Sequence, residues 1–519
     1  MSRAAYLVIL SKGLIVSGIT TWTLRVCAAL AASGRTVGIA IHRAPPDHDT
    51  LHTPMPRAVR AFDFTHLPDL ERCAGDLAPF IPAYAHAARE LARAGAPVVI
   101  TPYYLGDCFA AAAALTMIDP VGVRLLAVQQ LMIPYESHVL SHYEPAISGY
   151  VGVSDAISAQ LRAALPHRAG DVRTIPNSAP VPAQPPRPRP PLAGRPLALI
   201  YTGRMEHEQK RIGALIEMSR ALTARNIDHR LTLVGDGPAQ ADVDARLQDP
   251  ALLGRARRRA PVAPDLVERL LDDHDLFVLA SRAEGLSLSL VEAMARACVP
   301  VITRTPSGAA QVVEPGVSGE LVEAPHDATE SEVGHAMADG VQRAIAAGLD
   351  RLAKGAWETA RAKFSIERCA EDVGRAIDEA AASPAHAWPA TRPLAFTSAA
   401  AASGSGAVPP DGAARLRDRL ARLADRRIIL HGTGRHTTEL AHILAESPSR
   451  IVALADDDPA RQGRTMWNWP VIAPAEAART GATDVVISSW MNQDAIWDRR
   501  AVYERQGLTV HRLYDGPKS

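Results

Sequence analysis

Two glutamates eight positions apart, Glu284 and Glu292, carry the clearest chemical signal in the sequence. An apolar run at 275–281 predicts a strand before them, and residues 288–298 predict the helix that follows. Gly285 removes a side chain where a ligand phosphate could approach the chain closely. A helix dipole favours one acid at a helix start, but this does not account for two acids around a glycine.

Groups that could hold an anion lie close to the two glutamates in the sequence. The free amides of Leu286 and Ser287 would lie at the start of the helix, a position that attracts negative charge. Gly203 and Arg204 follow an earlier strand, and Lys210 opens the next helical stretch, so both cations could reach one anion. Basic residues at loop ends are often simply solvated, and both interpretations stay open from the residues alone.

Short apolar runs that alternate with helical stretches must position these residues. They occur at 4–10, 36–42, 97–101, 123–128 and 150–153, and again at 197–203, 229–238, 275–281 and 299–303. Such runs predict parallel sheets covered by helices on both faces. We therefore expect an α/β fold of two Rossmann-like lobes that face a cleft at the carboxyl ends of their strands. The segment 44–70, rich in Pro, His and Asp, is expected to be a loop.

Two biased stretches divide the chain. Residues 181–196 are dense in proline and predict an extended linker. Residues 383–412 mix Ser, Ala, Gly and Pro and predict a flexible linker. We therefore expect an N-terminal lobe at 1–180, a second lobe at 197–382 and an accessory Rossmann-like domain at 413–519.

These patterns together resemble the retaining GT-B glycosyltransferases of the family 4 type, also called glycosyl transferases group 1. Their signature is a Glu, seven residues and a second Glu, which here is EGLSLSLVE at 284–292. The Gly-Arg…Lys pair at 203–210 and the turn GDGP at 235–238 precede it in the expected order. The motifs at 150–161 and 172–180 resemble the end of the family's first lobe, and the helix at 364–380 resembles its helix that crosses back. The resemblance covers about residues 5–382.

The resemblance implies a nucleotide-sugar donor, UDP- or GDP-linked, and a glycan or lipid-linked acceptor. It assigns catalytic roles to Glu284, which would orient the sugar, and to Arg204 and Lys210, which would neutralise the diphosphate as the glycosidic bond breaks. Glu292 would accept hydrogen bonds from the ribose. The other donor-binding residues that it implies are Gly203, Gly285, Leu286, Ser287, Asp236 and Gly237. Such sites require no metal or other cofactor, and retention is described as front-face attack in which the leaving phosphate takes the acceptor's proton.

The first lobe departs from the family pattern. Relatives often carry a His after the strand at 123–128, where this chain has Gln129, and His138 is the candidate to replace it from a shifted loop. Gly18, in the loop before the first helix, lies where the family's acceptor and phosphate contacts often fall. These three residues are the acceptor-side candidates.

The C-terminal segment begins with a strand and the glycine loop HGTG, which contains Gly432 and Gly434. Asp456 ends a second strand about 20 residues after the loop, the spacing of an acid poised for a ribose. The segment resembles the nucleotide-binding half of bacterial sugar acyltransferases, without their hexapeptide-repeat half. A structural or regulatory module is an equally open interpretation.

The composition of the chain limits the kinds of partner that it could bind. Lys and Arg total 56 and Asp and Glu total 56, so the formal net charge is zero, which argues against a nucleic-acid partner bound through bulk positive charge. The five cysteines form no CxxC pair, so a reducing, cytoplasmic setting fits best. Peripheral contact with the inner membrane would need a local patch such as the arginines at 255–259. The oligomeric state stays open.

The leading hypothesis is a metal-independent, retaining glycosyltransferase in bacterial polysaccharide, lipopolysaccharide or glycolipid synthesis. A second hypothesis is a non-catalytic scaffold that binds nucleotide sugars, suggested by Gln129. A third is an NAD-dependent sugar-modifying enzyme that uses the C-terminal domain, although that domain lacks a Tyr-x-x-x-Lys pair.

Overall fold

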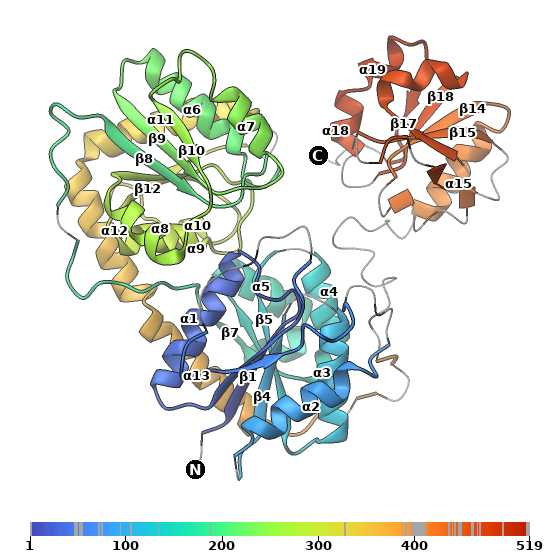
Figure 1. Cartoon of the computed structure of the whole chain (residues 1–519). Helices are drawn as coiled ribbons and strands as arrows, with labels where there is room; N and C mark the ends of the chain where they lie inside the picture. The colour runs from blue at the N-terminus through green and yellow to red at the C-terminus, as the bar shows by residue number, and fades with distance from the viewer. Residues whose placement is uncertain are drawn as a thin grey trace. The chain divides into compact units, whose positions relative to one another are not determined.

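A computed structural model gives the fold of the chain (Figure 1). It describes residues 3–45, 50, 55–70, 73, 76–93, 95–103, 106–132, 134–186, 188–325, 328–386, 388–389, 392–394, 396, 412–433, 436–437, 440, 443–444, 449–457, 461–463, 465–466, 469–489 and 493–514. The chain divides into two compact units. Met1–Met132 and Leu140–Ala395 form the first, and Ile133–Val139 and Phe396–Ser519 form the second.

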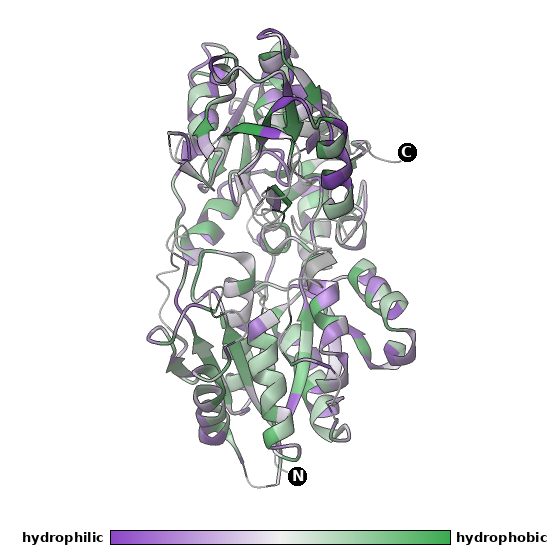
Figure 2. Ribbon diagram, turned by 90° about the vertical axis from the view of Figure 1, so that its right-hand side faces the viewer, coloured by the Kyte–Doolittle hydropathy of each residue, from purple (hydrophilic) through white to green (hydrophobic). Residues whose placement is uncertain are grey.

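The first unit begins with a parallel sheet in the order β3-β2-β1-β4-β5-β6-β7. The apolar runs predicted from the sequence form its central strands, because every residue of β1 and β4 is buried. Figure 2 shows these strands in the hydrophobic colour. The strands are β1 (Ala5–Leu10), β2 (Val37–Ile41), β3 (Arg60–Asp63), β4 (Val98–Pro102), β5 (Val123–Gln129), β6 (Ile147–Gly152) and β7 (Val172–Thr174).

One expectation for this lobe is wrong: the segment 44–70 is not all loop. Strand β3 runs parallel to β2 at the edge of the sheet. Of its four residues only Phe62 is buried, so the run has no apolar stretch that sequence reasoning could detect. Charged side chains on an edge strand are a common way to prevent pairing with another chain.

Helices cover this sheet. The Ser17 hydroxyl accepts a hydrogen bond from the Thr20 amide and caps the N-terminus of α1. Helix α3 is rich in alanine and almost wholly buried, which lets it pack closely between neighbouring elements. The helices of this lobe are α1 (Gly18–Ala32), α2 (Phe80–Leu91), α3 (Gly106–Ile118), α4 (Pro134–His142) and α5 (Asp155–Ala164), with 3₁₀ turns at Glu144–Ala146 and Pro166–Asp171.

The second sheet has the order β10-β9-β8-β11-β12-β13, and its pairs are all parallel. The chain order reverses between β8 and β11, so loops after these two strands diverge at the point where open α/β sheets bind ligands. Its strands are β8 (Leu197–Thr202), β9 (His229–Val234), β10 (Ala256–Arg259), β11 (Leu276–Leu279), β12 (Val299–Thr303) and β13 (Glu320–Val322). Its helices are α6 (Ile212–Ala224), α7 (Gln240–Arg246), α8 (Pro264–Asp272), α9 (Leu288–Ala295), α10 (Ala309–Val312), α11 (Glu330–Ala347) and α12 (Leu349–Lys363).

Helix α13 (Ile366–Ala382) returns from the second lobe to the first and packs against α1, β4, β5 and β6 (Figure 1). The buried Arg35 guanidinium donates to both carboxylate oxygens of Asp378, at 2.9 and 2.8 Å, and to the Gly374 carbonyl. A bidentate pair of this kind fixes the direction of the helix as well as its position.

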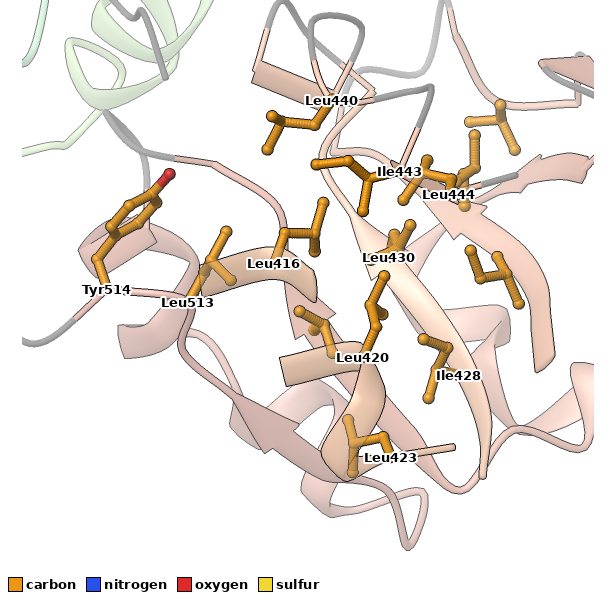
Figure 3. Close-up of a cluster of buried hydrophobic side chains, with 14 residues drawn as sticks. Leu416, Leu420, Leu423, Ile428, Leu430, Leu440, Ile443, Leu444, Leu513 and Tyr514 are labelled. Atoms are coloured by element: carbon orange, nitrogen blue, oxygen red, sulfur yellow. The ribbon is translucent and has the colours of Figure 1, made fainter. Parts of the chain in front are cut away.

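The second unit contains a third sheet, in the order β16-β17-β15-β14-β18-β19. Among the strand pairs that the structure describes there, only β16 and β17 are antiparallel. Neighbouring residues of β14 point to opposite faces: Ile428 and Leu430 join one apolar cluster (Figure 3) and Ile429 joins the other. The predicted α/β class with three Rossmann-like units is therefore confirmed. The elements are α15 (Gly412–Arg422), β14 (Arg427–His431), β15 (Arg450–Ala455), β16 (Thr465–Met466), β17 (Trp469–Ile472), a 3₁₀ helix (Pro474–Thr480), β18 (Asp484–Ile487), α18 (Gln493–Asp498), α19 (Ala501–Glu504) and β19 (Thr509–His511).

Candidate functional site

The loops after β8 and β11 bring together Lys210 and Glu284, two of the residues that the sequence singled out in the second lobe. Lys210 lies just before α6, and Glu284 lies between β11 and α9. The Lys210 Nζ atom donates to Glu284 Oε1 at 2.5 Å, with the two side chains 18% and 11% exposed. The Ser281 hydroxyl donates to the same oxygen at 2.6 Å. The pair is thus preformed and largely shielded, but solvent still reaches it.

The start of α9 adjoins this pair. Ser287 is the N-cap residue, and its hydroxyl accepts a hydrogen bond from the Leu290 amide at 3.4 Å. A small pocket beside Glu284 is lined by Ser281, Ser287, Thr303 and Thr305 together with apolar residues. Hydroxyl groups and a carboxylate around a helix start can bind both an anion and sugar hydroxyls.

Glu292 is held from the other lobe. Arg25, on α1, donates from Nη1 to Glu292 Oε1 at 2.5 Å, and its Nη2 lies 3.6 Å from Glu268 Oε1. Burial raises the pKa of the Glu292 carboxyl, and the Arg25 charge opposes that rise. Sequence reasoning missed Arg25, because no local pattern connects residues that lie 267 positions apart.

Gly285 and Gly18 lie where the two lobes approach each other. A Cβ atom on Gly285 would lie 1.8 Å from the main-chain oxygen of Gln130. A Cβ atom on Gly18 would lie 3.6 Å from the Cβ of Leu288. Asn177 Nδ2 adds a hydrogen bond to the Leu286 carbonyl at 2.8 Å. The missing side chain at Gly285 therefore serves the contact between lobes in this structure.

The turn at 235–238 packs onto the loop after β8. The Met205 amide donates to the Asp236 carbonyl at 2.5 Å. Gly237 has φ +141°, and a Cβ atom there would lie 2.5 Å from the Met205 carbonyl oxygen. Arg204 is exposed, and its carbonyl accepts a hydrogen bond from the Tyr201 hydroxyl. The turn therefore shapes the loop that begins with Gly203 and Arg204.

The remaining acceptor-side candidates, Gln129 and His138, belong to different units of the chain. Gln129 is the last residue of β5; it is buried, and its Nε2 donates to the Leu131 carbonyl at 2.9 Å. His138 is half-buried on α4, within the segment that groups with the second unit.

In the second unit the acid and the glycine loop are joined to each other. The Thr433 amide and hydroxyl donate to Asp456 Oδ2 at 2.9 and 2.5 Å, and Arg461 lies 3.4 Å from the same oxygen. Gly432 has φ +114°, and a Cβ atom there would lie 2.8 Å from the Ser488 carbonyl oxygen. Gly434 lies outside the described residues.

The two lobes of the first unit have the GT-B architecture. A solved structure of Anabaena HepE in complex with UDP-glucose matches with a TM-score of 0.53 and 17% identity, over 72% of this chain and 98% of that one. At this identity the match establishes the fold alone. The fold prediction is thus confirmed.

The second lobe matches a known sequence family. Residues 196–345 match the family described as Glycosyl transferases group 1. The chain is 28% identical over 184 residues to an α-D-kanosaminyltransferase of Streptomyces kanamyceticus, covering 35% of this chain and 45% of that protein. It is 32% identical over 135 residues to a putative colanic acid biosynthesis glycosyltransferase of Salmonella typhimurium, covering 25% and 33%. The chain thus spans less than half the length of these relatives.

The described part of the chain offers neither a membrane span nor a cluster of metal ligands. No helix there has the length and apolar character needed to span a bilayer. No group of three or more His, Cys, Asp or Glu side chains in it is arranged to hold a metal ion. The arginine-rich segment 255–259 contains the edge strand β10. On this strand Arg258 Nε lies 2.7 Å from Asp244 Oδ1 and forms an ion pair with it.

Proposed function

We propose that the first unit is a glycosyltransferase that moves a sugar from a UDP- or GDP-linked donor to an acceptor hydroxyl. The observation that carries the proposal is the Lys210–Glu284 pair, joined at 2.5 Å at the point where the strand order reverses. It lies within the 196–345 segment that matches a glycosyltransferase family. A donor diphosphate would attract Lys210 and free Glu284 to accept hydrogen bonds from the sugar.

The chemistry follows from charge. Negative charge grows on the leaving diphosphate as the glycosidic bond breaks, and preoriented cations stabilise that charge most strongly in the transition state. Lys210, the exposed Arg204 and the start of α9 would supply this stabilisation without a metal ion. Glu292 would offer its second carboxylate oxygen to the ribose while Arg25 holds the first.

We further propose retention of configuration by front-face attack. The acceptor oxygen forms its bond to the anomeric carbon on the face that the diphosphate leaves, and the leaving phosphate oxygen takes the acceptor's proton. Because Glu284 is assigned to sugar hydroxyls and Glu292 to ribose, neither carboxylate is free to act as a separate base. A relative named for colanic acid biosynthesis supports a role in bacterial glycan synthesis. We propose a glycan or lipid-linked acceptor and a cytoplasmic site of action, with peripheral membrane contact for a lipid-linked acceptor.

A thermal-shift panel of UDP-, GDP- and ADP-sugars on the full chain tests the proposal. A donor present at 100 times its Kd stabilises the folded state by about 2.7 kcal/mol. Release of the nucleotide with water as acceptor then measures bond cleavage. Glu284→Gln should abolish release, whereas Glu323→Gln, an exposed glutamate of the same lobe, should leave it unchanged. Stabilisation by a nucleotide sugar without any release would instead support the scaffold hypothesis.

A further inference from the structure

Arg211, which the proposed chemistry does not use, lies between the two loops of the candidate site. It is the residue before α6 and has φ +46° and ψ +48°, the left-handed region that a non-glycine residue rarely adopts. The residue is only 3% exposed. Both the left-handed backbone and the burial of a cation cost free energy, so contacts of Arg211 with the surrounding structure must offset that cost.

The guanidinium binds main-chain carbonyls. Nε donates to the Ala280 carbonyl at 2.8 Å, and Nη2 donates to the Ser281 carbonyl at 3.2 Å. Nη1 donates to the Pro325 carbonyl at 3.4 Å. Among the residues that the structure describes, no carboxylate forms an ion pair with Arg211. Burial lowers the pKa of this guanidinium, and the nearby charge of Arg282 lowers it further.

The bonds to Ala280 and Ser281 tie the loop before α6 to the loop after β11. The two loops also share hydrogen bonds from the Arg282 amide to the Gln209 carbonyl at 2.7 Å and from Gln209 Nε2 to the Ala283 carbonyl at 3.0 Å. Lys210 directly precedes Arg211 and meets Glu284 across the same junction. Removing the guanidinium would therefore loosen the junction that holds Lys210 opposite Glu284.

We propose that Arg211 is a positioning residue that holds Lys210 opposite Glu284, so that the amine meets the donor diphosphate. The inference rests on the proposed function. The fork of the guanidinium suits two neighbouring carbonyls, which a lysine amine cannot span in the same way.

Two substitutions test the role. Arg211→Gly removes the guanidinium and suits the left-handed backbone, so the chain can still fold. Arg211→Lys keeps the charge but loses the fork. Asn226→Gly is the matched control, because Asn226 is an exposed residue with φ +57° just after the same helix, α6.

Nucleotide release from the donor found by thermal shift gives the first readout. Arg211→Gly should lower kcat/KM by about 10²-fold, the effect of misplacing a catalytic group by roughly 1 Å, mainly through kcat. Arg211→Lys should retain part of the activity, and Asn226→Gly all of it.

In a Lys210→Ala background, Arg211→Gly should add little, because a residue that acts through Lys210 has no second effect. Full activity of Arg211→Gly, or losses that simply add, would overturn the inference.

Amine labelling gives a readout that needs no activity. Lys210 is one of five lysines, and its side chain is 18% exposed, against 72% for Lys354. Acetylation followed by mass spectrometry should show Lys210 protected relative to Lys354 in the parent chain and exposed in Arg211→Gly. Unchanged protection in Arg211→Gly would refute the positioning role. A parent chain that cleaves no nucleotide sugar would refute the proposed function while the labelling still decides the role of Arg211.

Discussion

An acid follows a buried strand in two regions of the molecule, Glu284 in the second lobe and Asp456 in the second unit. Both carboxylates accept a hydroxyl hydrogen bond, from Ser281 and from Thr433. Their other main partners differ. Glu284 binds the amine of Lys210 from a separate loop, whereas Asp456 binds the main-chain amide of Thr433.

We expect this difference to separate a ligand site from a structural contact. A donor anion can take over a lysine amine and leave the carboxylate free for a sugar. A main-chain amide cannot move away without distorting the loop to which it belongs. The spacing of about 20 residues that suggested a ribose-binding acid at Asp456 is equally satisfied by an acid that holds its own glycine loop. We therefore expect the hydrogen-bond partner of each acid to distinguish the two roles, because the sequence spacing does not.

Removing the cation from each acid should give the largest contrast. Lys210→Ala should lower kcat/KM for nucleotide release by about 10²–10³-fold, the usual cost of losing a group that stabilises developing negative charge. Arg461→Ala, which removes the cation near Asp456, should change the rate by less than about twofold. Comparable losses in both variants would show that the second unit takes part in the reaction.

The ion pair between the lobes should come next. Arg25→Ala leaves Glu292 without its closest cation in a largely buried setting and should lower the free energy of unfolding by about 1–3 kcal/mol. Adding Glu292→Gln should recover part of that loss, because the uncompensated charge disappears. Arg173→Ala is the control: its pair with Glu379 is about half exposed and should contribute less than about 1 kcal/mol. Urea unfolding of the full chain measures all four proteins.

The two hydroxyl groups allow a finer comparison. Thr433→Val removes one bond to Asp456 and should destabilise the region around β14 and β15 by about 1 kcal/mol without affecting nucleotide release. Ser281→Ala should instead lower release several-fold, since Glu284 would be less firmly oriented, and leave hydrogen exchange in β14 unchanged. Hydrogen–deuterium exchange and nucleotide-release rates should be measured on both variants. Slower release in Thr433→Val, or faster hydrogen exchange in β14 of Ser281→Ala, would contradict the comparison.

The central strands and the fold class were predictable because parallel strands buried on both faces form continuous apolar runs. Strand β3 was not, since an edge strand with one buried residue, Phe62, leaves no such run. The resemblance to a known family brought Lys210 and Glu284 forward as one site, and the structure shows their contact.

The contacts between distant segments could not be predicted. Nothing local in the sequence pairs Arg25 with Glu292, or shows that Gly285 lies against the Gln130 main chain. Arg211 was equally hidden, because its left-handed backbone and carbonyl partners leave no pattern in residue types. Each depends on where a loop from another strand passes.

The smallest expected effect is a pH dependence confined to the second unit. The hydrogen bond from His431 and the charges of His431 and Arg499 lower the pKa of Asp457 below its usual 3.8, while burial opposes this. The folded-state pKa therefore lies below the unfolded one, so the pair adds stability above about pH 3.8 and loses it as pH falls through the folded value. Because Asp457 is 41% exposed, the gain should stay under about 1 kcal/mol.

Asp457→Asn should thus speed pepsin cleavage of the second unit at pH 5, and its difference from the parent chain should vanish toward pH 3. Asp418→Asn, at an exposed ion pair on α15, should match the parent chain throughout. A difference between Asp457→Asn and the parent that grows as pH falls would mean that Asp457 is not held as a carboxylate by His431 and Arg499.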